Sequence, residues 1–374
     1  MTNNSVKNPS VAVIGAGMTG ILMAVRLREA GITDITILEK ADKVGGTWRE
    51  NTYPGVACDV PAHMYTYSFR GNPEWEHRFA HGNEIQDYME TVAREYGVTD
   101  TVRFNESLDE CHYRDGKWHL TTSLGNSLVV DFVVAATGIL HHPAYPDIPG
   151  MDSYRGDMFH TARWNHDVSL EGKRVGIIGT GSTATQVIST IAKTAGHLTV
   201  FQRTPQWVCS VPDKVYSEAD KAKLRGNQKL MTRLSERYAF AFRNIFTAAV
   251  TGNKLAHAFV NWATRRNLRK SVRDPELRAK LTPDYKVGCK RLIISGTFYE
   301  AIQRDNVALE TAGIERISES GVVTSDGTEH ELDVLILATG FHPFNFMRPM
   351  DLTGRDGVSI DQAWAKKVQA YRSL

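Results

Sequence analysis

The sequence predicts an α/β protein made of two similar halves, and three observations support this prediction. Two glycine-rich loops, GAGMTG at residues 15–20 and GTGSTA at residues 179–184, each follow a short apolar run typical of a strand. Each loop opens a stretch with helical spacing of apolar residues, and a second strand-like run follows it. In addition, DFVVAATG at residues 131–138 is echoed by DVLILATG at residues 333–340, as expected of an internal duplication. We therefore predict two Rossmann-like dinucleotide-binding domains.

The first half contains a complete strand–helix–strand unit. We expect a strand at residues 11–14, a helix over residues 21–30, and a strand at residues 35–38 that is followed directly by Glu39. Gly31 is expected to end the helix, because glycine adopts the left-handed conformation without strain. Such a unit forms a right-handed crossover between parallel strands.

The second half repeats this order. We expect strands at residues 174–178 and 198–201 and a helix over residues 186–194 between them. In both halves an Asp-Gly pair, at residues 115–116 and 326–327, lies between β-rich runs and predicts a hairpin.

Residues 208–286 fit neither half and predict a helical insertion into the second domain. No proline interrupts the chain between Pro212 and Pro275. Apolar side chains recur there at four-residue spacing, as on one face of a helix: Leu230, Leu234, Tyr238, Phe242 and Phe246. We interpret this stripe as core packing; the wall of a substrate pocket is the alternative.

The bulk properties exclude several classes of protein. The 374-residue chain has a net charge of only +2, so it offers nucleic acids no general attraction. Its four cysteines lie far apart, which argues against a metal site or a redox-active disulfide. No signal core and no run of about 18 apolar residues is present, so we expect a cytoplasmic protein without a membrane span. The basic cluster in the insertion is interpreted as a solvated helix face and comprises Arg265, Arg266, Arg269, Lys270 and Arg273.

The two loops are expected to bind two different dinucleotides. Glycines allow a tight turn and let phosphates approach the backbone amides at the start of the helix, where the helix dipole favours negative charge. In the first half, Glu39 lies about 20 residues after the loop, where a carboxylate accepts hydrogen bonds from a ribose diol. In the second half the corresponding strand end carries Arg203 and no carboxylate. A guanidinium can bind a 2′-phosphate, which favours NADPH over NADH.

Two further segments carry a more specific signal. GGTWRENTYPGVACD, residues 45–59, follows Glu39 closely, and its glycines allow the backbone to pass near a flat ring. YRGDMFHTARW, residues 154–164, lies between the two loops. Together they resemble the two fingerprints of the type I Baeyer–Villiger monooxygenases, with Tyr154 in place of the usual phenylalanine and Asn165 in place of the usual proline or aspartate.

The resemblance implies that the first domain binds FAD and the second NADPH. The residues that would contact FAD are Gly15, Gly17, Gly20, Glu39, Thr47, Trp48, Asp59 and Tyr65. Those that would contact NADPH are Gly179, Gly181, Ser182, Thr183, Gln186, Arg203, Thr204 and Lys290. The domains expected from it are an FAD-binding domain at residues 1–143, an NADPH-binding domain at residues 144–207 and 287–339, the helical insertion at residues 208–286, and a return to an incomplete FAD-binding domain at residues 340–374.

A reaction is implied as well. NADPH and O2 would be used to insert one oxygen atom next to the carbonyl of a small-molecule ketone, through a flavin peroxide, to give an ester or lactone. Arg291 resembles the family's arginine beside the flavin, and a fixed guanidinium there would stabilise the peroxide anion and the alkoxide that follows. Asp59 would pair with Arg291 and hold it in place. His160 would orient the two domains; a direct acid–base role is the alternative.

Two other functions stay open. A related flavin monooxygenase that oxidises sulfur or nitrogen uses a protonated peroxide and needs no arginine such as Arg291. The third hypothesis is a truncated dinucleotide-binding protein with an incomplete flavin site, because no Gly-Pro segment of the kind that completes the family's FAD domain follows Gly340. We expect this end to reflect a fragment, a truncated gene product or an isolated domain. No motif specifies which ketone is used or how many copies of the chain assemble.

Overall fold

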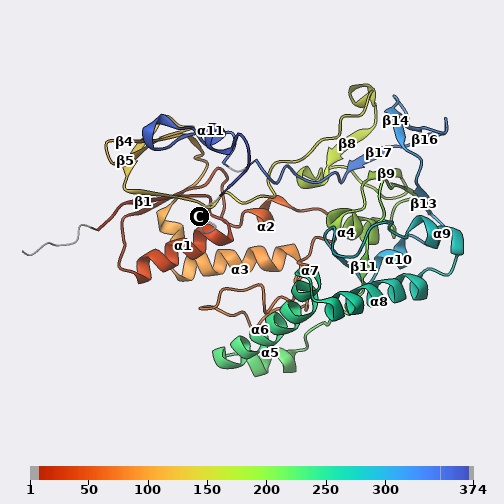
Figure 1. Ribbon diagram of the computed structural model, residues 1–374, viewed down its shortest axis with the longest axis horizontal. Coiled ribbons are helices and arrows are strands. Elements are labelled where there is room, and N and C mark those ends of the chain that lie inside the picture. Colours follow the sequence, from red (N-terminus) through yellow and green to blue (C-terminus); the bar gives the residue numbers. More distant parts are fainter. Residues whose placement is uncertain (1–7, 346, 370–374) are drawn as a thin grey trace, which may run out of the picture. The chain divides into compact units, whose positions relative to one another are not determined.

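The computed structural model describes residues 8–345 and 347–369 and divides the chain into two compact units. Unit 1 comprises the chain up to residue 50, residues 85–142 and the chain from residue 341 on. Unit 2 comprises residues 51–84 and 143–340. Each unit contains a parallel sheet and helices, which confirms the predicted α/β class (Figure 1). The predicted domains were defined by their ligands and stay a prediction; the compact units differ from them in placing residues 51–84 in unit 2.

Unit 1 is built on a four-stranded parallel sheet with β1 in its interior. Strand β1 pairs with β2 on one side and β7 on the other, and all of its residues are buried. The sheet order is β3 (Val102–Arg103), β2 (Ile35–Leu38), β1 (Val11–Ile14) and β7 (Phe132–Ala135). Helix α1 (Met18–Glu29) connects β1 to β2, so the predicted strand–helix–strand unit is confirmed. The helix begins three residues earlier than expected, because Gly17 of the loop is itself its N-cap.

A second sheet completes unit 1. Its central hairpin turns at Asp115 and Gly116, both with positive φ (52° and 78°), as a two-residue type I′ turn requires. The predicted hairpin is thereby confirmed. The sheet order is β18 (Asp351–Thr353), β4 (Leu108–Arg114), β5 (Lys117–Thr122) and β6 (Ser127–Val130). The other helical segments of this part of the chain are α2 (Thr47–Glu50), α3 (Gly82–Glu95), η1 (Val98–Thr101), η5 (Arg355–Gly357) and α11 (Ile360–Trp364).

Unit 2 repeats the same arrangement around β9. All pairings of its main sheet are parallel, and β17 lies beside β9 as β7 lies beside β1. The sheet order is β13 (Val307–Glu310), β10 (His197–Phe201), β9 (Arg174–Ile178), β17 (Val334–Leu337) and β8 (Asp157–His160). The repeated segments at residues 131–138 and 333–340 thus occupy equivalent places, as the internal duplication predicts.

Helix α4 (Ser182–Ile191) follows β9 and packs into the main core of unit 2. Its side chains Val187, Ile188 and Ile191 are almost fully buried, and burial of each contributes about 1.5–3 kcal/mol. The helix starts four residues before the predicted position, again because a loop glycine, Gly181, is the N-cap. Short elements complete the unit outside the insertion: η2 (Met151–Ser153), η3 (Thr161–Arg163), α10 (Phe298–Ala301) and an antiparallel sheet of β14 (Ile314–Ile317), β15 (Gly321–Thr324) and β16 (Glu329–Glu331), whose last hairpin contains Asp326 and Gly327 as predicted.

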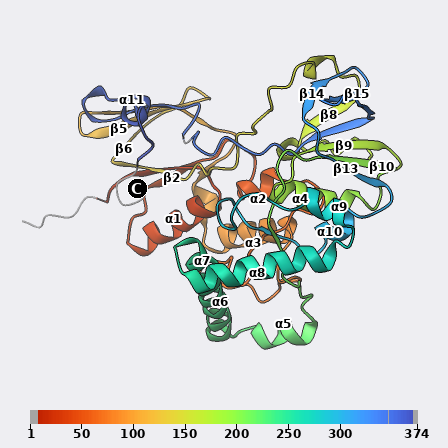
Figure 2. The same cartoon turned by 45° about the vertical axis from the view of Figure 1, so that its right-hand side comes forward.

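Helices occupy most of the insertion in unit 2 (Figure 2). Two short parallel strands, β11 (Val208–Cys209) and β12 (Ile293–Ile294), pair where the chain enters and leaves it. Between them lie α5 (Glu218–Leu224), α6 (Gln228–Phe242), the π-helical η4 (Arg243–Thr247), α7 (Ala248–Val250), α8 (Lys254–Ser271) and α9 (Pro275–Lys280).

The aromatic stripe of the insertion is less buried than a core interpretation predicts. Leu230 is exposed, and Leu234, Tyr238 and Phe242 are half-buried. The spacing also changes at η4, because a π-helical turn contains more residues than an α-helical one. Beyond this point Phe246 packs beside a small cluster that includes Trp207 and Val260. The stripe is therefore a continuous helix face only as far as Phe242.

Candidate active site

The first glycine loop of unit 1 is shaped by close backbone approach. Gly15 has φ 102°, and an added Cβ atom would lie 2.7 Å from the carbonyl oxygen of Ala136. An added Cβ at Gly20 would lie 1.9 Å from the carbonyl oxygen of Gly15. No side chain caps the start of α1 at Gly17, so the amide groups of the first turn have the arrangement that phosphate groups bind.

Glu39 is held at this loop by three hydrogen bonds. The side chain is buried at the end of β2. Its carboxylate accepts from the backbone amides of Ala16 at 2.8 Å and Ala41 at 3.1 Å, and from Nη1 of Arg49 at 2.9 Å. Arg49 was not among the predicted site residues, although it lies in the same GGTWRE segment as Thr47 and Trp48. This carboxylate stands where the Rossmann arrangement places a ribose diol.

The glycine pair before α2 packs against the first loop. Gly45 donates from its amide to the carbonyl of Ala16 at 3.0 Å, and an added Cβ at Gly46 would lie 3.1 Å from Cα of Gly17. Helix α2 begins at once with Thr47 and Trp48, both half-buried. A side chain at Gly46 would therefore crowd the loop, whereas an added Cβ at Gly45 would lie 1.8 Å from Oε1 of Gln86. The residues of unit 1 therefore fit an FAD molecule whose phosphates lie on the loop and whose ribose lies at Glu39.

The second glycine loop, in unit 2, has the same construction. Gly179 has φ 119°, and an added Cβ would lie 2.4 Å from the carbonyl oxygen of Ala338. No side chain caps α4 at Gly181, where an added Cβ would meet nothing within 4 Å. Ser182 and Thr183 form the first turn of α4 and are half-buried. This open helix start fits a second dinucleotide.

Tyr285 contacts the side chain of Lys290 and the backbone two residues after Arg203. Nζ of Lys290 lies 4.7 Å from the ring centroid of Tyr285, whose hydroxyl donates to the carbonyl of Pro205 at 3.1 Å. Pro205 follows Arg203 and Thr204, and the carbonyl of Thr204 accepts from the hydroxyl of Thr180 in the loop at 2.8 Å. Arg203 itself is exposed. Tyr285 was not predicted, because nothing in the local sequence marks a contact about 80 residues away in the chain.

Asp59 and Arg291 form an ion pair, the contact on which the predicted chemistry depends. Oδ2 of Asp59 accepts a short hydrogen bond from Nη2 of Arg291. Both residues belong to unit 2, although they are far apart in the sequence. The Arg291 side chain is 68% exposed and the Asp59 side chain 22%. The predicted pairing is confirmed, whereas the catalytic roles of the two residues stay predictions.

Each partner of this pair is anchored by backbone contacts. Next to Asp59, the amide of Cys58 donates to the carbonyl of Ala80 at 2.9 Å. Burial raises the pKa of the Cys58 thiol to about 12, so this cysteine stays protonated near neutral pH and is not a nucleophile. Two residues after Arg291, the amide of Ile293 donates to the carbonyl of Trp207 at 3.0 Å, in β12. Tyr65, the remaining predicted FAD contact, is half-buried in the loop that follows Asp59.

Gln186 has partners other than a cofactor. Its Oε1 atom accepts from the hydroxyl of Tyr53 at 2.9 Å, and its Nε2 atom donates to the carbonyl of Ala57 at 3.0 Å. The predicted contact of Gln186 with NADPH stays a prediction, but the structure assigns its amide to the loop that leads to Asp59.

The second fingerprint, residues 154–164, forms the edge of the main sheet of unit 2. The hydroxyl of Tyr154 donates to the carbonyl of Leu332 at 3.1 Å, a bond that the usual phenylalanine could not make. Asn165 accepts from the amide of Asp167 at 3.1 Å and so forms the turn itself. His160, at the end of β8, is buried, and burial lowers its pKa to about 4. It is therefore neutral near pH 7, and its orienting role stays a prediction.

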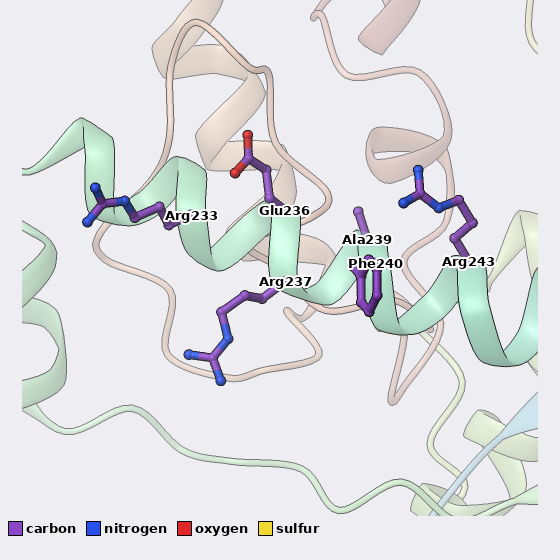
Figure 3. A pocket seen from close by; sticks show the side chains of 6 residues that line it. All are labelled: Arg233, Glu236, Arg237, Ala239, Phe240 and Arg243. Carbon is purple, nitrogen blue, oxygen red and sulfur yellow. The ribbon is translucent and has the colours of Figure 1, made fainter.

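The hollows described on the insertion are lined by none of the predicted site residues. One is lined by five side chains of α6, including Arg237 and Phe240, and by Arg243, the first residue of η4 (Figure 3). It contains none of the predicted site residues.

The basic cluster of α8 and its C-terminal end is exposed throughout, as interpreted from the sequence. Among the described residues, no helix is both long and apolar enough to cross a membrane.

Comparison with known proteins identifies the family. Residues 8–352 match the flavin-binding monooxygenase-like family. An uncharacterised monooxygenase of Mycobacterium tuberculosis is 48% identical over 98% of this chain and 74% of its own length. A Baeyer–Villiger monooxygenase of Streptomyces coelicolor is 42% identical over 97% of this chain and 70% of its own length. The structure of an oxidised steroid monooxygenase bound to NADP superposes with a TM-score of 0.87 at 32% identity, covering 97% of this chain and 77% of that one.

The chain therefore belongs to the flavin-binding monooxygenase-like family. Its resemblance to the Baeyer–Villiger monooxygenases, predicted from the two fingerprints, is confirmed. The two-domain dinucleotide-binding fold is confirmed by the same comparisons.

Proposed function

We propose that this chain is an FAD-containing, NADPH-dependent Baeyer–Villiger monooxygenase, which inserts one oxygen atom from O2 next to the carbonyl of a ketone. The observation that carries the proposal is the ion pair of Asp59 with Arg291. An oxygenase of sulfur or nitrogen has no use for a fixed guanidinium, whereas insertion beside a carbonyl develops negative charge on oxygen. The similarity to a Baeyer–Villiger monooxygenase of S. coelicolor supports the same reaction.

The two loops supply the cofactor sites of this proposal. FAD would lie on Gly15, Gly17 and Gly20 with its ribose at Glu39, and NADPH would lie on Gly179, Gly181 and the first turn of α4. Bound FAD would supply the redox chemistry, namely acceptance of a hydride from NADPH and activation of dioxygen. The relative that binds NADP supports the choice of nicotinamide cofactor. The 2′-phosphate would be bound by Arg203 and Lys290. Tyr285 contacts the Lys290 side chain and the carbonyl of Pro205, two residues after Arg203.

Arg291 would act on the charge that develops during oxygen insertion. A guanidinium carries five N–H donors and keeps its charge at any physiological pH. The contact with Asp59 engages Nη2, so Arg291 can hold Asp59 and donate to an oxyanion at the same time. Asp59 orients the guanidinium before the charge forms, which is how a preorganised donor lowers a barrier.

Oxygen transfer to paired substrates tests this function. The protein is supplied with FAD, NADPH and 18O2, and with a ketone and a thioether of the same carbon skeleton. We expect an ester that carries one 18O atom. Sulfoxide formation without ester would favour the sulfur-oxidising alternative, and the absence of any labelled product would favour a dinucleotide-binding protein without activity. A cytoplasmic location stays a prediction.

A further inference from the structure

We propose that Tyr53 is a positioning residue that couples occupancy of the second glycine loop to the placement of Arg291. The inference rests on the proposed function, since Arg291 matters only if its guanidinium acts in oxygen insertion. It concerns residues of unit 2 alone. Its basis is a continuous series of contacts from the second turn of α4 to the Asp59–Arg291 pair.

The series begins at the amino end of α4. Tyr53 is 7% exposed and packs in the main core of unit 2. Its hydroxyl donates to Oε1 of Gln186 at 2.9 Å. Gln186 lies in the second turn of α4, the helix that follows the second glycine loop. A buried hydroxyl bonded to a polar side chain so close to this loop is placed to respond to a ligand at the start of the helix.

The loop that contains Tyr53 lies directly on this helix. Nε2 of Gln186 donates to the carbonyl of Ala57 at 3.0 Å. At Gly55, with φ 83°, an added Cβ would lie 2.8 Å from the carbonyl oxygen of Gln186 and 2.3 Å from the hydroxyl oxygen of Thr190. Only a residue without a side chain allows so close an approach. A shift of the first turns of α4 must therefore move residues 53–57 with it.

The same loop ends at the catalytic pair. Asp59 follows Ala57 by two residues, and the bond between the Cys58 amide and the Ala80 carbonyl fixes a pivot between them. Asp59 then holds Arg291. Displacement of Ala57 by α4 is thus transferred across the pivot to the carboxylate that orients the guanidinium. By thermodynamic linkage, a ligand at α4 that changes the Asp59–Arg291 pair must have its own affinity changed by that pair.

If Tyr53 had only a structural role, its ring and not its hydroxyl would matter. The ring fills core space and would do so without its hydroxyl, so Tyr53→Phe separates packing from coupling. Tyr154→Phe is the matched control. It removes another tyrosine hydroxyl of unit 2 that donates one hydrogen bond, to Leu332, and whose pKa burial likewise raises to about 12. This hydroxyl has no contact with α4 among those described.

The test is a double-mutant cycle on the dissociation constant of NADP+, measured by calorimetry without ketone or turnover. We expect Asp59→Ala to weaken NADP+ binding about fivefold or more in the unaltered chain and in Tyr154→Phe, but less than twofold in Tyr53→Phe. An equal effect of Asp59→Ala in all three backgrounds, or no effect in any, overturns the inference. If the inference is overturned in this way but the protein oxygenates ketones normally, the proposed function still stands. Failure of the unaltered chain to bind NADP+ contradicts both.

Discussion

The two glycine loops share one backbone design and differ in the charge at the end of the neighbouring strand. In each, the first glycine donates from its amide to the last residue of that strand: Gly15 to Leu38 at 2.8 Å, and Gly179 to Phe201 at 3.2 Å. A second hydrogen bond joins each loop to the residues that follow the neighbouring strand. In unit 1 it runs from the Ala16 amide to Glu39, and in unit 2 from the Thr180 hydroxyl to the Thr204 carbonyl.

This difference in charge is the basis of the proposed choice between two nucleotides. Glu39 is buried and fixed by three hydrogen bonds, which suits a neutral ribose diol and repels an additional phosphate. Arg203 is exposed, which suits a charged 2′-phosphate that remains partly hydrated. On the proposed assignment, the shared loop geometry would bind phosphate groups in both units, and the side chain after the second strand would select the nucleotide.

The largest effect is expected for Arg291→Ala, which should impair oxygen insertion but not electron transfer between the two cofactors. Arg291→Ala leaves both loops intact, so the variant is expected to oxidise NADPH while ester formation falls about 10²- to 10³-fold, as for the loss of one oxyanion donor. Consumption of NADPH, ester yield and hydrogen peroxide are measured together. Asp59→Ala is expected to give a smaller fall, because it positions the guanidinium. Unchanged ketone oxygenation by Arg291→Ala would remove the basis of the Baeyer–Villiger assignment.

The next effect tests whether the two loops tolerate the same residue. Gly20 and Ala184 occupy equivalent third positions of the two loops. Gly20→Ala is expected to destabilise the fold by about 1–3 kcal/mol and to abolish flavin retention, because the Cβ would lie 1.9 Å from a backbone oxygen. Ala184→Gly should cost only about 1 kcal/mol, through lost helix propensity. Urea unfolding and bound-flavin absorbance report both; equal tolerance at the two positions would contradict the comparison.

Removal of the Arg203 charge in unit 2 should have an intermediate effect, on the choice of coenzyme. Arg203→Ala is expected to reduce the preference for NADPH over NADH by about tenfold, since one charge-assisted hydrogen bond is lost. The rates of flavin reduction by the two coenzymes measure the ratio. Arg304→Ala, at another exposed arginine of the same unit, serves as the control and should leave the ratio unchanged. A preference that survives in Arg203→Ala would assign selectivity to Lys290 alone.

The smallest effect concerns the loss of stability between pH 7 and pH 6, to which two buried histidines of unit 2 should contribute. Burial lowers the pKa of His63 and of His160 to about 4, below the usual value of about 6.5. The unfolded chain then binds more protons than the native one, so stability is lost as the pH falls from about 6.5 towards 4. Each histidine is expected to remove about 0.7 kcal/mol between pH 7 and pH 6.

The variant His160→Gln should flatten this pH dependence, as followed by urea unfolding across the same range. His197→Gln, at an exposed histidine of unit 2, should not. Identical pH profiles for His160→Gln and the unaltered chain would show that the buried imidazole does not contribute.

Local signals allowed the sequence to predict most of the framework. Apolar runs before the loops placed β1 and β9 to the residue, and the Asp-Gly pairs placed two hairpins. Helix starts were set several residues late, because Gly17 and Gly181 cap their helices without the side-chain bond that usually marks a start. The irregular face of α6 and η4 was missed, since a π-helical turn leaves no mark in four-residue spacing.

The contacts of the candidate site depended on long-range packing and were harder to predict. The Asp59–Arg291 pair was expected only through resemblance to a known family, and the structure contains it. Arg49, Tyr285 and Tyr53 were not predicted as partners of Glu39, Lys290 and Gln186. Periodicity reports which face of an element is buried, but not which distant side chain meets it there.

The most direct test of two loops with two different dinucleotides is reduction of bound flavin without oxygen. Protein saturated with FAD is mixed anaerobically with NADPH or with NADH, and the visible flavin absorbance is followed. We predict rapid bleaching by NADPH and at least about tenfold slower bleaching by NADH, because only NADPH carries the 2′-phosphate that Arg203 and Lys290 would bind. Equal rates with both coenzymes, or no bleaching by either, would contradict the assignment of NADPH to the second loop.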